Sequence, residues 1–408
     1  MRRVALSMLA ALFLAAPASA ADPWAIPTDT ATALRDPDRF AWQMFVALTW
    51  PADPGSRTPA VDRAYGNPGP VVFETWALSD QTFLPRGAMP PVWTDIPWAA
   101  PRNLGTRAVP RQVALFRQVD PVPPGNTNHQ QEEIRLNRPA FDYVRDNRLY
   151  SIEGQQFRFI NDIPVNFPAD AIEVKAVWRP IREEDKARYQ WAAMKDPKSG
   201  KMFNYGLTGL HIESKVLPHW LWATFEHVDN PYRNGIHDEG WLNPSRDSVA
   251  CPPERIDCNL PPQGFGLQGT RWEFYRLRGS QVDYIDAAGR PVILGNSELE
   301  TGFQQSASCM SCHARSTIGP LRNDAARFAF GPDAKAHPPA PPEPMRLPVF
   351  RTLPDGQVAS FNGPPDPAAL LLPGQVAGGT ATYLPLDFVW SLIEAQSEVA
   401  APPPPPAR

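Results

Sequence analysis

The sequence predicts an α+β protein: a β-rich body built on an antiparallel sheet, with short helices and a distinct C-terminal segment. Apolar and polar residues alternate in several stretches after residue 172, as they do in half-buried strands. Proline is abundant, at 50 of 408 residues, which favours loops and strand edges over long helices. Thirteen Trp and twenty Phe residues supply the apolar area for a large core.

The first twenty residues have the features of a cleavable export signal. Arg2 and Arg3 give a charged start, residues 4–16 are apolar, and residues 17–20 end in the Ala-Ser-Ala pattern of a cleavage site. The apolar run is too short for a transmembrane helix. We therefore expect a signal peptide over residues 1–20, a periplasmic location and no membrane span in the mature chain.

Two helices are predicted in the first half of the body. An Asp-Pro start and apolar residues at helical spacing predict a helix over residues 40–48. An asparagine N-cap and an early proline predict a second helix over residues 137–148. Between them, residues 71–76 predict a strand, and the proline-rich stretch 84–110 predicts a loop.

Closely spaced strands predict the antiparallel sheet, which we expect between about residues 70 and 290. The hairpin between the second and third of the predicted strands should turn at about His219. The predicted strands cover residues 172–178, 207–216, 221–228, 271–277 and 281–285.

The pentapeptide Cys309-Met310-Ser311-Cys312-His313 is the clearest chemical signal in the chain. Two thiols three residues apart lie on one side of a helical turn, where each can form a thioether with a vinyl group of haem. His313 follows directly and can bind the iron as the proximal ligand. The spacing therefore predicts one covalently bound haem c, held by Cys309, Cys312 and His313. Export agrees with this prediction, because bacterial c-type haem is attached outside the cytoplasm.

A redox-active cysteine pair and half of a zinc site are the alternative interpretations of this motif. A zinc site needs a second pair of ligands at suitable spacing, whereas Cys251 and Cys258 have six residues between them. A thioredoxin-like motif is expected near a βαβ pattern early in a small domain, and this motif lies late in a long chain. In an oxidising compartment, Cys251 and Cys258 are expected to form a disulfide that closes a tight loop.

The motif also sets the expected organisation of the chain. A short helix over residues 298–308 should lead into the motif, residues 331–348 form a proline-rich linker, and apolar spacing predicts a closing helix over residues 382–395. The expected units are residues 1–20, a signal peptide; 21–295, the β-rich body; 296–400, the haem-bearing segment packed on that body; and 401–408, a disordered proline tail.

The sixth iron ligand decides what a haem can do, because methionine suits electron transfer, whereas an open position permits binding or catalysis. Met345 follows His313 by 32 residues and is the best candidate near the motif, with ordinary packing as the alternative. His337 in the proline-rich linker is a second candidate. Met310 lies between the two cysteines and cannot reach across the ring.

A pair of histidines in the predicted hairpin offers another candidate site. A turn at about His219 would place His211 and His227 opposite each other on neighbouring strands, with Glu213 and Glu226 nearby. Such a group can act as a distal acid–base site. Hydrogen-bonded histidines in a partly buried hairpin are the alternative interpretation.

Four further side chains have two possible roles each. His129 lies in a polar cluster and is either a ligand or a solvated surface residue. Three arginines after the motif either pair with haem propionates or stay in solvent. They are Arg315, Arg322 and Arg327.

Residues 207–212, 220–230 and 308–314 resemble a poorly characterised family of exported bacterial mono-haem c-type cytochrome proteins. The resemblance extends over most of the mature chain and implies haem at the two cysteines and the histidine of the motif, but it implies no substrate. The chain departs from small electron-carrier cytochromes c, in which the motif lies near the start of a compact helical domain. Here the motif follows a large β-rich region.

The first expectation for function is electron transfer through the covalent haem, with a redox protein as partner. A haem enzyme acting on peroxide, a nitrogen oxide or an organic substrate, with an open or exchangeable distal position, is the alternative. A haem-based sensor or binding module is the third possibility. The net charge of −4 and the lack of a basic tract argue against a nucleic acid as partner.

The predicted disulfide can be tested directly. Peptide mapping of the exported protein under non-reducing conditions should recover Cys251 and Cys258 in one linked peptide pair, because export exposes close thiols to oxidants. Recovery of both residues as alkylated free thiols would contradict the pairing.

Overall fold

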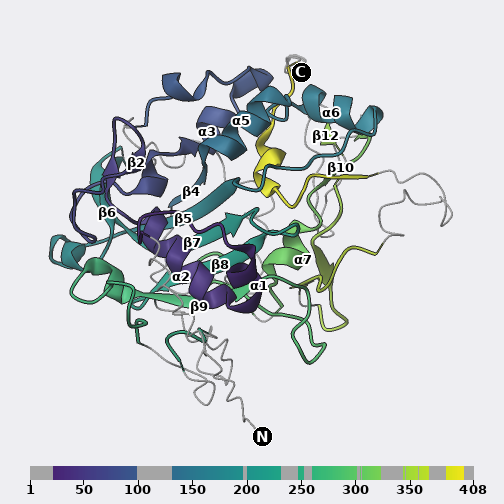
Figure 1. Cartoon of the computed structure of the whole chain (residues 1–408). Helices are drawn as coiled ribbons and strands as arrows, with labels where there is room; N and C mark the ends of the chain where they lie inside the picture. Colours follow the sequence, from purple (N-terminus) through teal and green to yellow (C-terminus); the bar gives the residue numbers. More distant parts are fainter. Residues whose placement is uncertain are drawn as a thin grey trace, which may run out of the picture.

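A large antiparallel sheet lies at the centre of the chain in the computed structural model (Figure 1). Its strand order is β3-β4-β5-β7-β8-β9, and β6 pairs with the N-terminal part of β7. The strands are β3 (Ala77–Leu78), β4 (Gln131–Leu136), β5 (Ile172–Pro180), β6 (Trp191–Lys195), β7 (Met202–Ser214), β8 (Leu221–His227) and β9 (Tyr275–Gln281). The structure describes residues 22–98, 131–195, 200–230, 247–251, 260–300, 304, 306–322, 343–344, 346–356, 358–366 and 383–398.

Short helices and two-stranded ribbons surround this sheet. The α-helices are α1 (Thr30–Arg35), α2 (Pro37–Leu48), α3 (Ser79–Thr82), α5 (Arg138–Asp146), α6 (Ile152–Ile160) and α7 (Cys309–His313). The 3₁₀-helices are η1 (Val72–Thr75), η2 (Pro85–Gly87), η3 (Trp93–Asp95), η4 (Glu183–Ala187), η5 (Arg271–Phe274) and η7 (Trp390–Glu394). The ribbons pair β1 (Ala52–Asp53) with β2 (Thr58–Pro59), β10 (Thr317–Ile318) with β15 (Leu384–Pro385), β11 (Leu321–Arg322) with β12 (Glu343–Pro344), and β13 (Phe350–Thr352) with β14 (Val358–Ser360).

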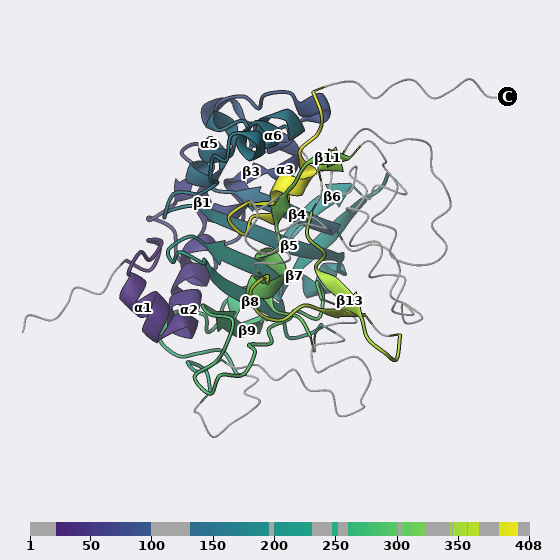
Figure 2. The ribbon, with the colours of Figure 1, turned by 90° about the vertical axis from the view of Figure 1, so that its right-hand side faces the viewer.

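Helix α2 begins where the sequence provides a cap and carries an apolar face to the sheet. The Asp36 side chain accepts a hydrogen bond from the Arg39 amide at 3.3 Å, and Pro37 occupies the first turn, where no N–H is needed. Phe45 of α2 stacks on Phe225 of β8 with ring centroids 4.4 Å apart. Helix α2 thus covers one face of the sheet, and α1 packs against α2 (Figure 2).

The two faces of the sheet differ in chemistry, as β5 illustrates. Ile172, Val174 and Ala176 are buried in the apolar core that includes α2. Glu173 and Lys175 alternate with them and therefore point to the opposite face. The second face is thus charged, and the Cys-Met-Ser-Cys-His segment and the C-terminal segment lie against it.

The fold class is confirmed as α+β with a large antiparallel sheet and a few short helices. The predicted strands 172–178, 207–216 and 221–228 correspond to β5, β7 and β8. The predicted helices 40–48 and 137–148 correspond to α2 and α5. The sequences of these elements combine a clear apolar periodicity with cap or turn residues at their ends. Local sequence preference and tertiary packing therefore favour the same secondary structure.

Four sequence-based predictions of elements are wrong. Residues 71–76 form η1 rather than a strand, and the described part of the predicted helix 382–395, residues 383–395, contains β15 and η7 rather than an α-helix. The described residues of 298–308 form turns instead of a helix. The two strands predicted over 271–285 are η5 followed by the single strand β9, which passes through Gly279 at a bulge.

Strand β9 contains a bulge opposite β8. Gly279 has a positive φ of 152°, a conformation that glycine adopts without steric cost, and the register with β8 shifts there. The sequence also gave no clear sign of β4 and β6, because Glu, which recurs in β4, and Ala, which recurs in β6, are less common in strands, nor of the short α6.

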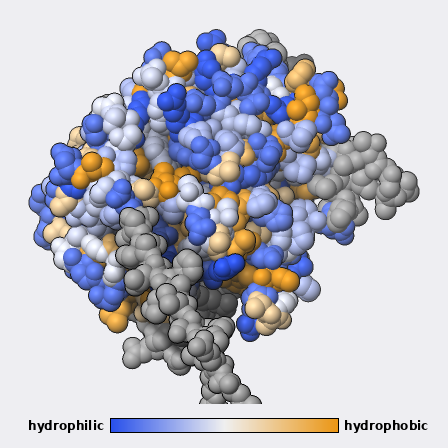
Figure 3. Space-filling model, in the orientation of Figure 1, coloured by the Kyte–Doolittle hydropathy of each residue, from blue (hydrophilic) through white to orange (hydrophobic). Residues whose placement is uncertain are grey.

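Several predictions concern residues outside the described ranges. These are the signal peptide over 1–20, most of the linker 331–348 and the tail 401–408. Cys251 is buried, but its predicted partner Cys258 also lies outside the described residues. Among the described residues, no helix combines the length and apolar character that crossing a membrane requires. On the face drawn in Figure 3, hydrophobic residues are scattered in small patches among hydrophilic ones.

The packing of α2 on the sheet yields the first test of the fold. Replacing Phe45 by alanine should lower the free energy of unfolding by about 3–5 kcal/mol, because it empties a site between α2 and β8. Chemical denaturation measures this loss. The matched control is Leu34→Ala on α1, where the side chain is 58% exposed and little change is expected. Equal effects of the two substitutions would show that α2 does not close the core.

Candidate functional site

Helix α7 carries the Cys-Met-Ser-Cys-His motif and is attached to the last strand of the sheet. Ser308 caps the helix, with its hydroxyl accepting from the Ser311 amide at 3.4 Å. Gln281 of β9 donates to the Ser308 hydroxyl at 3.0 Å and accepts from the Met310 amide at 3.1 Å. Met310 is fully buried in a core shared by the sheet and the C-terminal segment. The motif is therefore held in a fixed position against the body.

The two thiols of the motif lie in a covered, negatively charged environment. Cys309 and Cys312 are not joined to each other. Burial, with added repulsion from Glu300, raises the pKa of Cys312 to about 12 and that of Cys309 well above its usual value. Redox-active Cys-x-x-Cys pairs show the opposite shift, because they need a thiolate. The environment therefore disfavours the oxidoreductase interpretation.

The imidazole of His313 is oriented by a backbone carbonyl. Its Nδ1–H donates to the Phe388 carbonyl oxygen at 2.8 Å, so Nε2 carries the free lone pair. Nε2 lies 3.6 Å from Glu213 Oε1, and the ring packs on Trp222 with centroids 4.4 Å apart. Burial lowers the pKa of His313 to about 3, which keeps the ring neutral. A neutral imidazole with one nitrogen bound to a carbonyl is what a metal-binding histidine requires.

The segment 383–395 holds the motif from the other side. Its strand β15 pairs with β10, which follows the motif directly. Trp390 donates from Nε1 to the Cys312 carbonyl at 3.0 Å, and Ser316 donates to the Val389 carbonyl at 2.8 Å. Phe388, whose carbonyl meets His313, has a positive φ of 70°. A strained backbone conformation is thus kept at the residue that orients the imidazole.

A buried ion pair supports this strained turn. Lys215 Nζ lies 2.6 Å from Asp387 Oδ1, and both side chains are 8% exposed. The other Asp387 oxygen accepts from the Phe167 amide at 2.7 Å. Asp387 also has a positive φ, of 51°. The strained conformation of Asp387 and Phe388 therefore depends on their contacts with the body.

The charged face of the sheet lies opposite the motif. His211 and Glu213 of β7 are 7% and 4% exposed, and Lys175 of β5 is the cross-strand neighbour of His211. His211 Nε2 lies 3.5 Å from Glu300 Oε2, and Lys175 Nζ lies 3.1 Å from Glu132 Oε2. Burial and the neighbouring Glu173 raise the pKa of Glu213 well above its usual range. This face combines acidic, basic and imidazole groups with little solvent.

The residues fit a c-type haem by their chemistry. Glu213 acts electrostatically on both thiols and lies 3.6 Å from His313 Nε2, so the three donor atoms share one acidic neighbour. Two buried polar atoms near them, His211 Nε2 and Glu213 Oε2, have no hydrogen-bond partner among the described residues, although His211 Nε2 lies 3.5 Å from Glu300 Oε2. The porphyrin provides four nitrogens, so iron needs only one or two ligands from the chain. At 3.6 Å from Nε2, the Glu213 carboxylate has to turn aside when a haem is bound.

The structure corrects the predicted pairing of the two hairpin histidines. His211 pairs with Thr224, not with His227, because the turn over residues 215–220 is centred closer to Leu217. His227 is three residues beyond Thr224, the observed partner of His211. Because neighbours along a strand alternate between faces, His227 lies on the face opposite to His211. Glu226 does share the face of His211, but its carboxylate accepts hydrogen bonds from Ser297. The proposed His211–His227 acid–base pair is therefore wrong, while His211 and Glu213 remain together.

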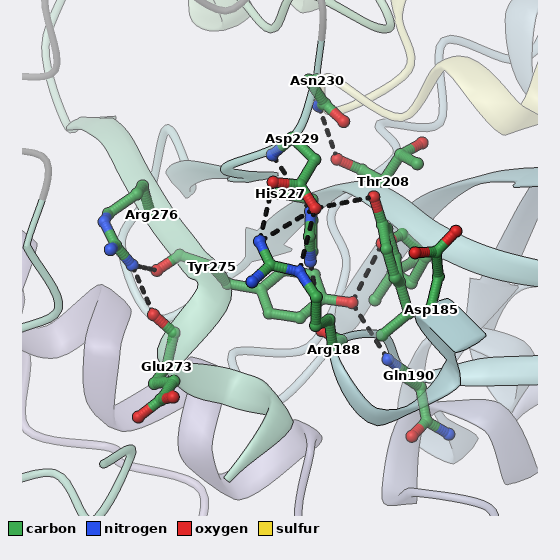
Figure 4. A network of polar contacts seen from close by, with 12 residues as sticks. Asp185, Arg188, Gln190, Thr208, His227, Asp229, Asn230, Glu273, Tyr275 and Arg276 are labelled. Carbon is green, nitrogen blue, oxygen red and sulfur yellow. Dashed lines mark hydrogen bonds and ion pairs between the residues drawn. The ribbon is translucent and has the colours of Figure 1, made fainter. Parts of the chain in front are cut away.

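His227 belongs to a separate polar network (Figure 4). Its ring is stacked on Tyr189 with centroids 3.7 Å apart, Nε2–H donates to the Arg188 carbonyl at 3.1 Å, and Nδ1 accepts from the Asp229 amide at 3.2 Å. Arg188 in turn pairs with Asp229 at 2.7 Å. Burial lowers the pKa of His227 to about 4. This histidine is thus a satisfied structural residue.

The remaining sequence candidates divide into described and undescribed residues. Arg315 is buried and donates to the carbonyls of Ser311 and Gly363, while its guanidinium lies over the Phe361 ring. Its guanidinium therefore binds groups of the chain itself, which disfavours a contact with a haem propionate. Candidates that lie outside the described residues, or whose side chains do, are Met345, His337, His129, Arg322 and Arg327.

Sequence reasoning missed four residues that the fold brings to the site: Lys175, Trp222, Glu300 and Phe388. Alternation in the strand 172–178 did place Lys175 on one face, but the pattern could not tell that this face is covered. The Phe388 carbonyl has no side-chain signature at all. Within the described ranges, no three His, Cys, Asp or Glu side chains are arranged to hold a metal ion by themselves.

Comparisons with protein-family models, curated proteins and solved structures find no match to this chain. The interpretation of the site therefore depends on its residues and their geometry.

The environment of His227 predicts a pH effect on stability. Its pKa is lower in the folded chain than in the unfolded chain, so the unfolded chain binds more protons between about pH 6.5 and 4. The contribution of His227 is complete above about pH 6.5 and is lost as the pH falls toward 4, by roughly 2–3 kcal/mol. Chemical denaturation across this range measures it, with His227→Phe retaining the stacking on Tyr189 but not the titration. Parallel stability curves for the two proteins would contradict the prediction.

Proposed function

We propose that this chain is an exported mono-haem c-type cytochrome that transfers electrons through one covalently bound haem. The observation that carries the proposal is the arrangement of the motif. Its two thiols and the Nε2 atom of His313 share Glu213 as an acidic neighbour, and the Phe388 carbonyl fixes the imidazole through Nδ1. The signal-like N-terminus and the sequence resemblance support the same function and a periplasmic location.

The residues of this chain have distinct roles in that function. The haem supplies a centre that gains and loses one electron when it is bound. Cys309 and Cys312 tether it, and His313 provides a neutral imidazole nitrogen whose basicity is raised by the hydrogen bond to Phe388. Trp222 packs on the imidazole and limits access of water. The side chain of His313 is still 18% exposed, which favours electron exchange with a partner redox protein near this edge.

A haem enzyme with an exchangeable distal position is the second candidate. One observation favours it: Glu213 and His211 lie on the face toward which the iron-binding nitrogen points. Such groups are not required for an electron carrier, whereas acid–base side chains beside the iron are typical of haem enzymes. Optical spectra distinguish the two, because a carrier with two strong protein ligands is low-spin and indifferent to carbon monoxide.

Covalent haem attachment is the first consequence to test. Replacing Cys309 and Cys312 together by serine should abolish attachment, because no thioether can form. The purified protein should then lose its haem on acid–acetone extraction, and its intact mass should lack one haem. Met310→Leu is the matched control, because it changes the centre of the motif but preserves the thiols and the apolar packing. Wild-type protein that releases its haem on extraction would contradict the proposal.

A further inference from the structure

Two buried polar side chains on the sheet have only long ionic contacts at their ends: His211 Nε2 lies 3.5 Å from Glu300 Oε2, and Glu213 Oε1 lies 3.6 Å from His313 Nε2. Glu213 and His211 are more than nine-tenths buried, and Glu213 Oε2 and His211 Nε2 lack hydrogen-bond partners among the described residues. Most buried polar groups in proteins are hydrogen-bonded, so exceptions call for a ligand or a bound molecule. These two exceptions, among several in the described residues, are two positions apart on β7 and therefore lie on one face of the sheet.

The iron-binding nitrogen of the motif points to this pair. His313 Nε2 lies 3.6 Å from Glu213 Oε1, and the ring of Trp222, on the neighbouring strand, packs beside it. A group bound to Nε2 would therefore have Glu213 and His211 as neighbours. Lys175, the next charged residue on this face, forms an ion pair with Glu132, with Nζ 3.1 Å from Oε2.

We propose that Glu213 and His211 line the sixth position of the haem iron, which accordingly accepts a small hydrogen-bonding molecule of the water or peroxide class instead of a methionine or histidine of this chain. The inference rests on the proposed covalent haem and deepens it by assigning the distal side. A carboxyl group and an imidazole can both donate to and accept from a small oxygen-containing ligand. A thioether would leave both side chains unsatisfied in a buried site.

Carbon monoxide is the probe for this assignment. The ferrous holoprotein should bind it, and the infrared C–O stretching band should report hydrogen bonding from the distal side. Glu213→Leu and His211→Phe should each shift this band toward the frequency of an apolar site. Glu213→Gln, which keeps the shape and a polar group, should shift it less. Glu183→Gln is the control: it removes a carboxylate on η4 that is 75% exposed and paired with Lys186, and the band should stay unchanged.

The possible results separate the inference from the proposed function. Covalent haem that stays low-spin and does not bind carbon monoxide would overturn the inference and leave the cytochrome proposal intact. So would carbon monoxide binding with a band that is the same in wild type, Glu213→Leu and His211→Phe. A wild-type protein without covalent haem would overturn both. Covalent haem content of each variant, measured first, shows that a band shift does not come from a lost site.

Discussion

The register between β5 and β7 is the constraint on which the site depends. Antiparallel pairing of Lys175 with His211 and of Glu173 with Glu213 places four polar side chains on one face, while their apolar neighbours fill the core under α2. A slip by one residue would exchange the two faces and destroy both the core and the site. Burial of the apolar face under α2 fixes the register between β5 and β7. The same register determines which polar side chains are neighbours on the charged face.

The opposite side of the site depends on contacts that are distant in sequence. Helix α7 has five residues and cannot be stable by itself. Gln281 secures its start, Trp390 binds the Cys312 carbonyl, and the Phe388 carbonyl orients His313. The last of these contacts uses backbone with positive φ, which costs free energy that the surrounding packing must offset. The imidazole orientation is thus a property of the complete fold and not of the motif.

The sequence predicted the parts of this arrangement that have a local cause. The motif identified the cysteines and His313, and alternation identified β5, β7 and β8. The wrong predictions concern features that depend on contacts formed only in the folded chain. The strand β9 was predicted as two strands, and a hairpin turn placed at His219 instead of near Leu217 moved the predicted partner of His211 by three residues, from Thr224 to His227. Because strand geometry alternates, an error of an odd number of residues changes the face and not merely the distance.

Buried charge on one sheet face explains why the chain needs so large a body around one short motif. Carboxylates such as Glu173 and Glu213 lose hydration when they are covered, and their raised pKa values reflect this cost. The dense aromatic core on the other face, in which Trp42 and Phe45 pack around Phe225, supplies the compensating burial. A compact helical domain carries less apolar area to offset such a face. The β body therefore does more than support the motif: its stability allows acid–base groups to be kept beside it in a covered environment.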